Sequence, residues 1–204
     1  DEDEPKNIAD TVFKMGLKYI VLTCVNRDDL ADGGAEHFAK TVEEIKKKDS
    51  TIAVEVLTSD FNGSIESIKT VVESPIKVFA QNLETVERLT HPIRDPRAGY
   101  QKTLTVLKKA KELNPNIITK SSIILGMGET DEEINKTFED LRLHEVDIVT
   151  LGQYLRPTLN HLPIDRWVTP DEFEKYRKEG LEYGFKEVVS GPVSYTHLTL
   201  PTKA

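Results

Sequence analysis

The stretch VLTCVNRDDLADGGAEHF, residues 21–38, joins the end of an apolar run to a charged loop and then to a new periodicity. Residues 18–25 form a short, β-branched apolar run that is typical of a buried strand. Residues 34–49 place Phe38, Val42 and Ile45 at helical spacing. The loop between them carries four charged groups and two adjacent glycines, which is more than a strand-to-helix connection needs. The stretch therefore predicts one strand–loop–helix unit whose loop has the residues to position a ligand.

The same alternation continues along the whole chain. Further strands are predicted at 51–60, 76–85, 117–129, 146–155 and 185–192, and further helices at 5–16, 64–74, 100–114, 131–145 and 169–184. Thr130 with Glu133, and Thr169 with Pro170, mark the starts of the last two helices. Strict alternation predicts an α/β protein with a parallel sheet covered by helices, either a barrel or an open doubly wound sheet. In both architectures, ligands bind at the carboxyl ends of the strands.

Composition narrows the class of protein further. A length of 204 residues predicts one domain, and the net charge of −8 argues against partners such as nucleic acid or anionic lipid. No apolar run approaches the roughly 20 residues that span a membrane, and the acidic start DEDEP predicts no targeting segment. The single cysteine, Cys24, excludes an internal disulfide, and the five scattered histidines make a zinc site improbable.

Polar or glycine residues follow every predicted strand. The glycine-rich LGMGET, residues 125–130, opens a helix but matches neither the dinucleotide-binding nor the phosphate-binding pattern. Asn82 and Glu84 lie two residues apart and would share one face of a strand, where an amide and a carboxylate suit the hydroxyls of a ribose. A core asparagine satisfied by its neighbours explains the spacing equally well. Lys120 is either a Schiff-base lysine or, more ordinarily, a lysine paired with a carboxylate.

Six stretches, in this order and spacing, together resemble lipoyl synthase. They are VLTCVNRDDLADGGAEHFAKTV, VFAQNLETVERL, TKSSIILGMGETDEE, TLGQYLRPT, HLPIDRWVTPDEFEKY and GFKEVVSGP. The resemblance runs from about residue 3 to Pro192, and it implies that residues 1–192 form a partial (β/α)6 TIM-like barrel of the radical S-adenosylmethionine type. It also implies a sulfurtransferase of protein lipoylation, which inserts two sulfur atoms at C6 and C8 of a protein-bound octanoyl group.

The resemblance implies cofactors and partners as well. One [4Fe–4S] cluster would cleave S-adenosylmethionine to a 5′-deoxyadenosyl radical that abstracts hydrogen, and a second cluster would be consumed as the sulfur source. The substrate would be carried on an octanoylated lipoyl carrier protein or domain, and a donor such as a ferredoxin would supply electrons. The motifs look more like those of eukaryotic members, which implies the mitochondrial matrix; otherwise the location would be cytoplasmic.

The resemblance also assigns residues to the site. The residues expected to bind S-adenosylmethionine are Thr23, Asn82, Glu84, Thr103, Lys120, Gly126, Gly128 and Glu129. Those expected at the barrel mouth, toward the methionine moiety or the substrate arm, are Asn26, Arg27, Asp28, Asp29, Gly33, Gly34 and Gln153. Family members usually have Asp in place of Asn26 and His in place of Gln81, which weakens any claim of a required charge at position 26.

The sequence departs from the family at both ends. Members supply the cluster ligands from two N-terminal cysteine motifs, and neither is present here; Cys24 replaces a serine and is not expected to be a ligand. The chain as given is therefore expected to bind no cluster and to be inactive. Residues 193–204, VSYTHLTLPTKA, replace the expected LVRSSY and resemble a translated sequencing adapter, so they are expected to be a non-native tail.

Two other functions stay open from the residues. One is an aldolase-like barrel that forms a Schiff base on Lys120, with Glu84 or Glu129 as the acid or base. The other is a non-catalytic barrel remnant that binds a carrier domain or a nucleoside.

Overall fold

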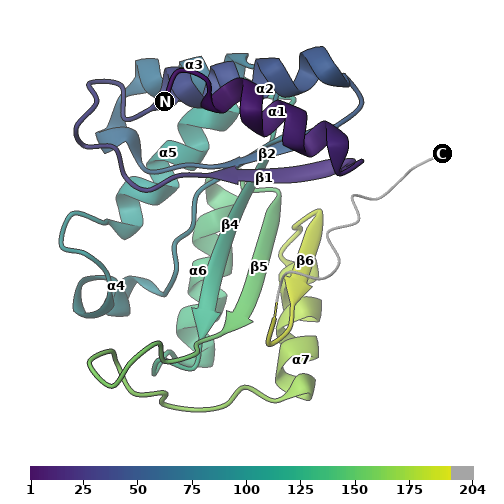
Figure 1. The fold of residues 1–204 in the computed structure, drawn as a ribbon. Helices are drawn as coiled ribbons and strands as arrows, with labels where there is room; N and C mark the ends of the chain where they lie inside the picture. The colour runs from purple at the N-terminus through teal and green to yellow at the C-terminus, as the bar shows by residue number, and fades with distance from the viewer. Residues whose placement is uncertain (194–204) are drawn as a thin grey trace. The chain divides into compact units, whose positions relative to one another are not determined.

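The computed structural model describes residues 1–193, which divide into two compact units. Among the described residues, the first unit comprises residues 1–81 and 102–119, and the second comprises residues 82–101 and 120–193. Strands and helices alternate in both units (Figure 1).

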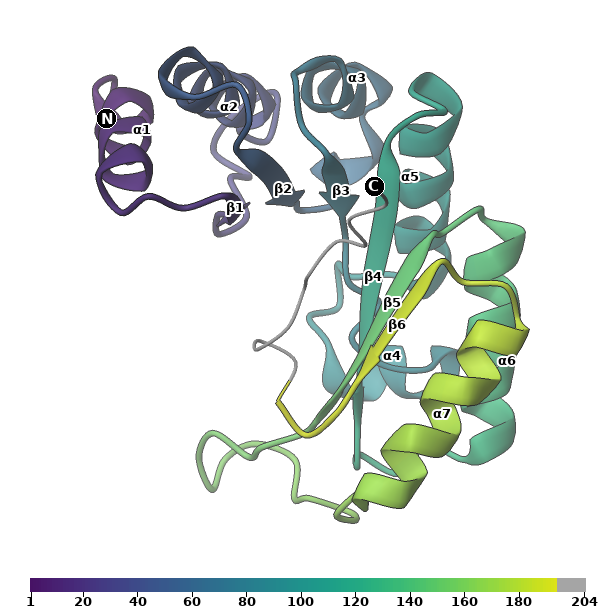
Figure 2. The ribbon, with the colours of Figure 1, turned by 90° about the vertical axis from the view of Figure 1, so that its right-hand side faces the viewer.

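The first unit is built on three parallel strands. These are β1 (Tyr19–Thr23), β2 (Ala53–Leu57) and β3 (Val78–Ala80), with Thr23 opposite Leu57 and Leu57 opposite Ala80. Figure 2 shows helices of this unit in a row along one side of these strands. The helices of this unit are α1 (Glu4–Lys14), α2 (Ala35–Lys48), α3 (Ile65–Glu73), the short 3₁₀ turn η1 (Phe61–Gly63) and most of α5 (Tyr100–Leu113).

Side chains alternate between the two faces of β2, with Val54 and Val56 on one face and Glu55 on the other. Val54 and Val56 are fully buried, as are the apolar residues Val42 and Ile45 of α2. Glu55 points the other way, because successive side chains of a strand alternate. Its carboxylate is buried and accepts a hydrogen bond from the Tyr19 hydroxyl at the start of β1.

The second unit repeats the same plan. Its parallel strands are β4 (Ile118–Leu125), whose first two residues belong to the first unit, β5 (Ile148–Gln153) and β6 (Glu187–Ser190). Its helices are α4 (Glu87–Ile93), α6 (Asp131–Leu143) and α7 (Pro170–Glu182), and the last two lie along one side of the strands (Figure 2). Ile134, Phe138 and Leu141 of α6 are fully buried in its core.

The predicted starts of α6 and α7 are confirmed. The Thr130 hydroxyl accepts a hydrogen bond from Glu133 N at 3.3 Å, and the Glu133 carboxylate accepts one from Thr130 N at 2.9 Å. Thr169 and Glu172 form the same reciprocal pair, with distances of 3.3 Å and 2.7 Å. Each pair satisfies two backbone N–H groups that the first turn of a helix leaves without partners.

Two predictions were wrong in detail. The third strand, predicted over 76–85, ends at Ala80, and Glu84 has a φ of +66°, so Asn82 and Glu84 lie beyond the strand rather than on one of its faces. Glu84 instead forms a single parallel bridge with Ile123 of β4. The helix α4 was not predicted, because Pro92 in its last turn interrupts a helical pattern.

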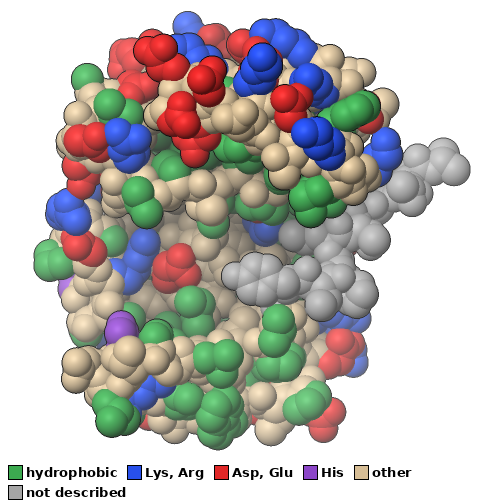
Figure 3. Space-filling model, viewed as in Figure 1, with side chains coloured by type: hydrophobic (Ala, Val, Ile, Leu, Met, Phe, Trp, Pro, Cys, Tyr) green, Lys and Arg blue, Asp and Glu red, His purple; other side chains and the backbone are tan. Residues whose placement is uncertain are grey.

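The surface of the first unit carries acidic and basic side chains intermixed over its helices (Figure 3). Many of them pair, as Lys48 does with Asp10 at 2.6 Å. Within residues 1–193, no helix has the length and apolar character to cross a membrane. The predicted non-native tail, apart from Val193, lies outside the described residues.

Candidate functional site

The segment that follows β3 presents an amide and a carboxylate together. Asn82 Nδ2 donates to Glu84 Oε1 at 3.1 Å, and both side chains are half-buried. A positive φ at a glutamate costs free energy and persists only where neighbouring structure holds it. Here β4 holds it, because Glu84 N donates to Ser122 O at 2.9 Å and Ile124 N donates to Glu84 O at 2.8 Å. The pair is thus fixed in place by backbone hydrogen bonds.

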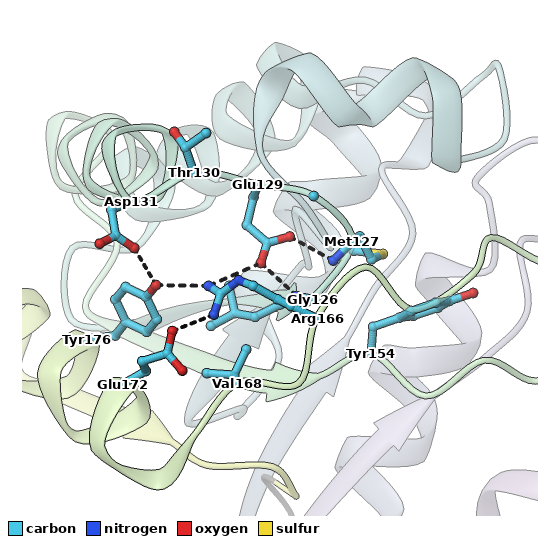
Figure 4. A network of polar contacts seen from close by, with 12 residues as sticks. Gly126, Met127, Glu129, Thr130, Asp131, Tyr154, Arg166, Val168, Glu172 and Tyr176 are labelled. Atoms are coloured by element: carbon cyan, nitrogen blue, oxygen red, sulfur yellow. Dashed lines mark hydrogen bonds and ion pairs between the residues drawn. The ribbon is translucent and has the colours of Figure 1, made fainter.

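The glycine-rich loop after β4 is organised around one buried carboxylate. The Glu129 carboxylate accepts hydrogen bonds from Gly126 N at 2.6 Å and from Met127 N at 2.9 Å, and its side chain is only 1% exposed (Figure 4). Gly126 and Gly128 have φ values of +95° and +101°, which favour glycine. Glu129 therefore shapes its own loop. Its expected contact with a cofactor stays a prediction.

A chain of charged side chains joins this loop to α7. Arg166 lies 3.8 Å from the Glu129 carboxylate and 2.6 Å from that of Glu172, and it donates to the Tyr176 hydroxyl at 3.0 Å (Figure 4). Tyr176 in turn donates to Asp131 at 2.5 Å. Burial, together with the hydrogen bond to Asp131, raises the pKa of Tyr176 well above its usual range. The hydroxyl therefore stays protonated and serves as a donor in this network.

Gln153 forms hydrogen bonds that hold the long segment between β5 and α7, residues 154–169. Its amide nitrogen donates to Leu125 O at 3.3 Å and to Arg166 O at 3.3 Å, and its amide oxygen accepts from Val168 N at 2.9 Å. The segment carries exposed apolar side chains, which Figure 3 shows gathered in the lower part of the view. These are Leu155, Leu159, Leu162 and Trp167. The predicted mouth residue Gln153 is thus a buried anchor, and any contact with a substrate stays a prediction.

The predicted mouth loop lies in the first unit and is held by its own contacts. Arg27 and Asp29 pair through two hydrogen bonds of 2.7 Å and 2.5 Å, while Asn26 and Asp28 are exposed. Gly33 and Gly34, with φ values of +62° and +88°, lead into α2. The N-cap residue of α2 is Gly34, which has no side chain to serve as a cap. The Asp32 carboxylate instead accepts hydrogen bonds from Gly34 N at 2.9 Å and from Glu36 N at 2.8 Å, a contact that was not predicted.

The remaining predicted residues lie in different settings. Thr23 is exposed at the end of β1, whereas Thr103 is 2% exposed within α5, in the predicted helix. Lys120 is buried in β4, where it has an interaction partner.

The second unit brings together one group of predicted site residues. Asn82, Glu84, Lys120, Gly126, Gly128, Glu129 and Gln153 all belong to it. Thr23, Thr103 and the mouth loop belong to the first unit. Three arginines that organise the second unit, Arg88, Arg94 and Arg166, were missed, because a side chain that reaches a distant carbonyl or carboxylate leaves no periodic signal in the sequence.

The described residues do not fit an iron–sulfur cluster. Within residues 1–193, no group of three or more His, Cys, Asp or Glu side chains could hold a metal ion. Cys24, the single cysteine of the sequence, is exposed, and partial burial of its thiol raises the pKa of Cys24 and so disfavours a thiolate.

Comparison with known proteins defines the class. Residues 1–141 match the model of the Radical SAM superfamily, so the chain belongs to this family. The crystal structure of methylornithine synthase (PylB) superposes with a TM-score of 0.70 at 16% identity, covering 93% of this chain and 54% of that one. HydG, a maturase of the [FeFe]-hydrogenase, gives 0.65 at 17% identity, covering 93% and 49%. The predicted fold class, a partial TIM-like barrel of the radical S-adenosylmethionine type, is thereby confirmed.

The particular relatives are lipoyl synthases. The chain is 60% identical over 193 residues to the lipoyl synthase of Legionella pneumophila (strain Corby), covering 95% of this chain and 59% of that protein. It is 58% identical to the lipoyl synthase of Francisella tularensis subsp. novicida (strain U112), with the same coverage. The resemblance found in the sequence is confirmed, and the chain spans 59% of the length of these relatives. Neither alternative function gains support from them.

Proposed function

We propose that this chain is part of a lipoyl synthase, which inserts two sulfur atoms at C6 and C8 of an octanoyl group by radical S-adenosylmethionine chemistry. The observation that carries the proposal is the 60% identity with a lipoyl synthase over 95% of this chain. Membership of the Radical SAM superfamily supports the same reaction class.

The second unit fits the adenosyl part of S-adenosylmethionine. Asn82 and Glu84 offer a donor and an acceptor to the two hydroxyls of a ribose, and their half-buried position shields these bonds from water. Gly128 has a φ of +101°, and an added Cβ there would contact the Asp165 side chain at 3.8 Å, so the loop backbone adopts a conformation that favours glycine. When bound, S-adenosylmethionine supplies the radical that removes hydrogen from the substrate. The residues of this chain bind and orient it.

The rest of the reaction is proposed for the whole protein. Two [4Fe–4S] clusters would be held by cysteines outside this chain, since its described residues do not fit a cluster. The partners proposed are an octanoylated lipoyl carrier protein and an electron donor such as a reduced ferredoxin. The relatives named above are bacterial, so they give no support to the mitochondrial location, which stays a prediction from the motifs.

Titration of the chain with S-adenosylhomocysteine, followed by calorimetry, tests the adenosyl site. We expect saturable binding that weakens about tenfold in Glu84→Gln, because a hydrogen bond to a charged group contributes roughly 1.5–3 kcal/mol. The matched control is Glu87→Gln, which changes an acid three residues away that bonds to Gln101. Equal affinities in Glu84→Gln and Glu87→Gln would contradict this role of Glu84.

A further inference from the structure

Arg94 caps two carbonyl groups of the segment that carries Asn82 and Glu84. The residue follows the last turn of α4, and its backbone N–H donates to Thr90 O at 2.8 Å. Its Nη1 atom donates to Leu83 O at 3.1 Å and to Asn82 O at 3.4 Å. The guanidinium therefore holds the Asn82–Glu84 backbone from the side of α4, while β4 holds it through the hydrogen bonds of Glu84.

Arg88, at the other end of the same helix, reaches the glycine-rich loop. Its Nη2 atom donates to Gly128 O at 2.7 Å. Its Nε and Nη2 atoms also pair with both oxygens of Glu133, at 2.6 Å and 2.9 Å. Glu133 is the acid of the capping box of α6, so Arg88 fixes the carbonyl end of the loop to the start of that helix.

We propose that Arg88 and Arg94 are positioning residues, which make α4 a brace that sets the spacing between Asn82–Glu84 and the Gly126–Glu129 loop. The proposal rests on the proposed function, because these are the two segments expected to hold the adenosyl group. Neither arginine touches that group in this scheme. Each acts through a backbone carbonyl of a segment that does.

Two features make a brace necessary. Glu84 has the unfavourable φ of +66°, and the segment before it lies beyond the end of β3, where the ladder hydrogen bonds of the strand have stopped. Gly126 and Gly128 both have positive φ values, and glycine gains the most freedom when its contacts are lost. A guanidinium group is suited to this role, since it carries five N–H donors in a fixed plane. The short helix thus gives these two segments a common support.

The first test is hydrogen exchange on the variants Arg94→Met and Arg88→Met, which keep an apolar stem and remove the donors. The Glu84 amide bonds to Ser122 O of β4, and the Ile124 amide of β4 bonds to Glu84 O. In Arg94→Met, we expect both amides to exchange at least about tenfold faster. In Arg88→Met, we expect the same of the Met127 amide, which bonds to Glu129. Both variants should also bind S-adenosylhomocysteine about tenfold more weakly, since a small misplacement of a binding segment is costly.

Arg142→Met is the matched control. Arg142 also donates to a backbone carbonyl, that of Val146, and it also belongs to the second unit, but it lies at the far end of α6. Its loss should lower stability without changing exchange at Glu84 or affinity for the nucleoside. Arg94→Lys should recover part of the affinity, because an ammonium group can bond to only some of the carbonyl positions that the guanidinium reaches.

The outcomes separate the brace from the proposed function. Unchanged exchange at Glu84 and Ile124 in Arg94→Met would overturn the brace, and so would a loss of affinity no larger than that of Arg142→Met. If the unaltered chain fails to bind S-adenosylhomocysteine, the adenosyl site of the proposed function is contradicted. The exchange rates then still decide whether α4 holds the two segments.

Discussion

Gly126 occupies a position that rejects a side chain for two independent reasons. Its φ is +95°, and an added Cβ would lie 2.5 Å from both Arg166 O and Gln153 Nε2. Gly152, the last residue but one of β5, has neither problem, because an added Cβ there meets nothing within 4 Å. One glycine is thus required by local geometry, and the other is not.

Gly126→Ala is predicted to lower the free energy of unfolding by at least about 2 kcal/mol, since it adds backbone strain to a clash with a backbone oxygen. Gly152→Ala should change it by less than about 0.5 kcal/mol. Urea denaturation of both variants measures the difference. A similar loss in the two would show that the loop relaxes freely around a new methyl group.

Asp49 contributes to the pH dependence of the free energy of unfolding at low pH. Hydrogen bonds from the hydroxyl and the N–H of Thr51, at 2.6 Å and 2.8 Å, lower the pKa of Asp49 from 3.8 to about 2. Because the pKa is lower in the folded chain than in the unfolded one, ionised Asp49 stabilises the fold above about pH 4. This contribution is lost as the pH falls toward 2.

An NMR titration of the Asp49 carboxyl should therefore give a midpoint near pH 2 in the native chain. Thr51→Ala removes the hydroxyl donor and is predicted to raise that midpoint. Thr70→Ala, which removes a threonine from an exposed face of α3, should leave it unchanged. A midpoint near 3.8 in the native chain would contradict the assignment.

At the scale of the residue, the sequence predicted site positions, and the structure adds hydrogen bonds at two of them that the sequence could not show. Glu129 and Gln153 were predicted as contacts of a cofactor or substrate, and both are buried residues whose polar atoms bond to their own loops. The motifs around these two residues indicated that the local structure or the site depends on them. The sequence could not show that a carboxylate three residues after Gly126 turns back onto its N–H, because that depends on a positive φ.

Secondary-structure elements were more predictable where their signals are local. The capping boxes of α6 and α7 follow from a threonine and an acid three residues later, and the structure contains both. The brace helix α4 was missed because its seven residues include Pro92, and its role depends on two arginines that bond to distant carbonyls. Short elements held by tertiary contacts leave little pattern to find.

Thr169→Ala is predicted to cost about 1 kcal/mol of stability, because it removes the acceptor for Glu172 N at the start of α7. Thr169→Ser should retain most of it. Thr70→Ala is the matched control, since Thr70 lies within α3 and bonds back to Glu66 O, so alanine there should be neutral or slightly stabilising. Thermal unfolding of the three variants ranks their stabilities. An equal effect of Thr169→Ala and Thr70→Ala would contradict the role of Thr169 as the cap of α7.

For the whole chain, alternation of apolar strands with amphipathic helices was sufficient to predict an α/β protein, and the motifs narrowed this to one family. Parallel strands in each unit and the match of residues 1–141 to the Radical SAM superfamily confirm that prediction. The division into two units was not predicted. Sequence periodicity describes each element by itself, whereas compact units are defined by contacts between residues far apart in the chain.

We propose that residues 3–192 bind the adenosyl group of S-adenosylmethionine within a lipoyl synthase. The most direct measurement replaces the matching segment of the Legionella pneumophila relative with these residues and assays lipoylation of an octanoylated carrier protein by mass spectrometry. We expect that the hybrid inserts sulfur, and that Glu84→Gln in the hybrid reduces the rate at least about tenfold. A hybrid that folds and binds its clusters, yet leaves the octanoyl group unchanged, would contradict the claim.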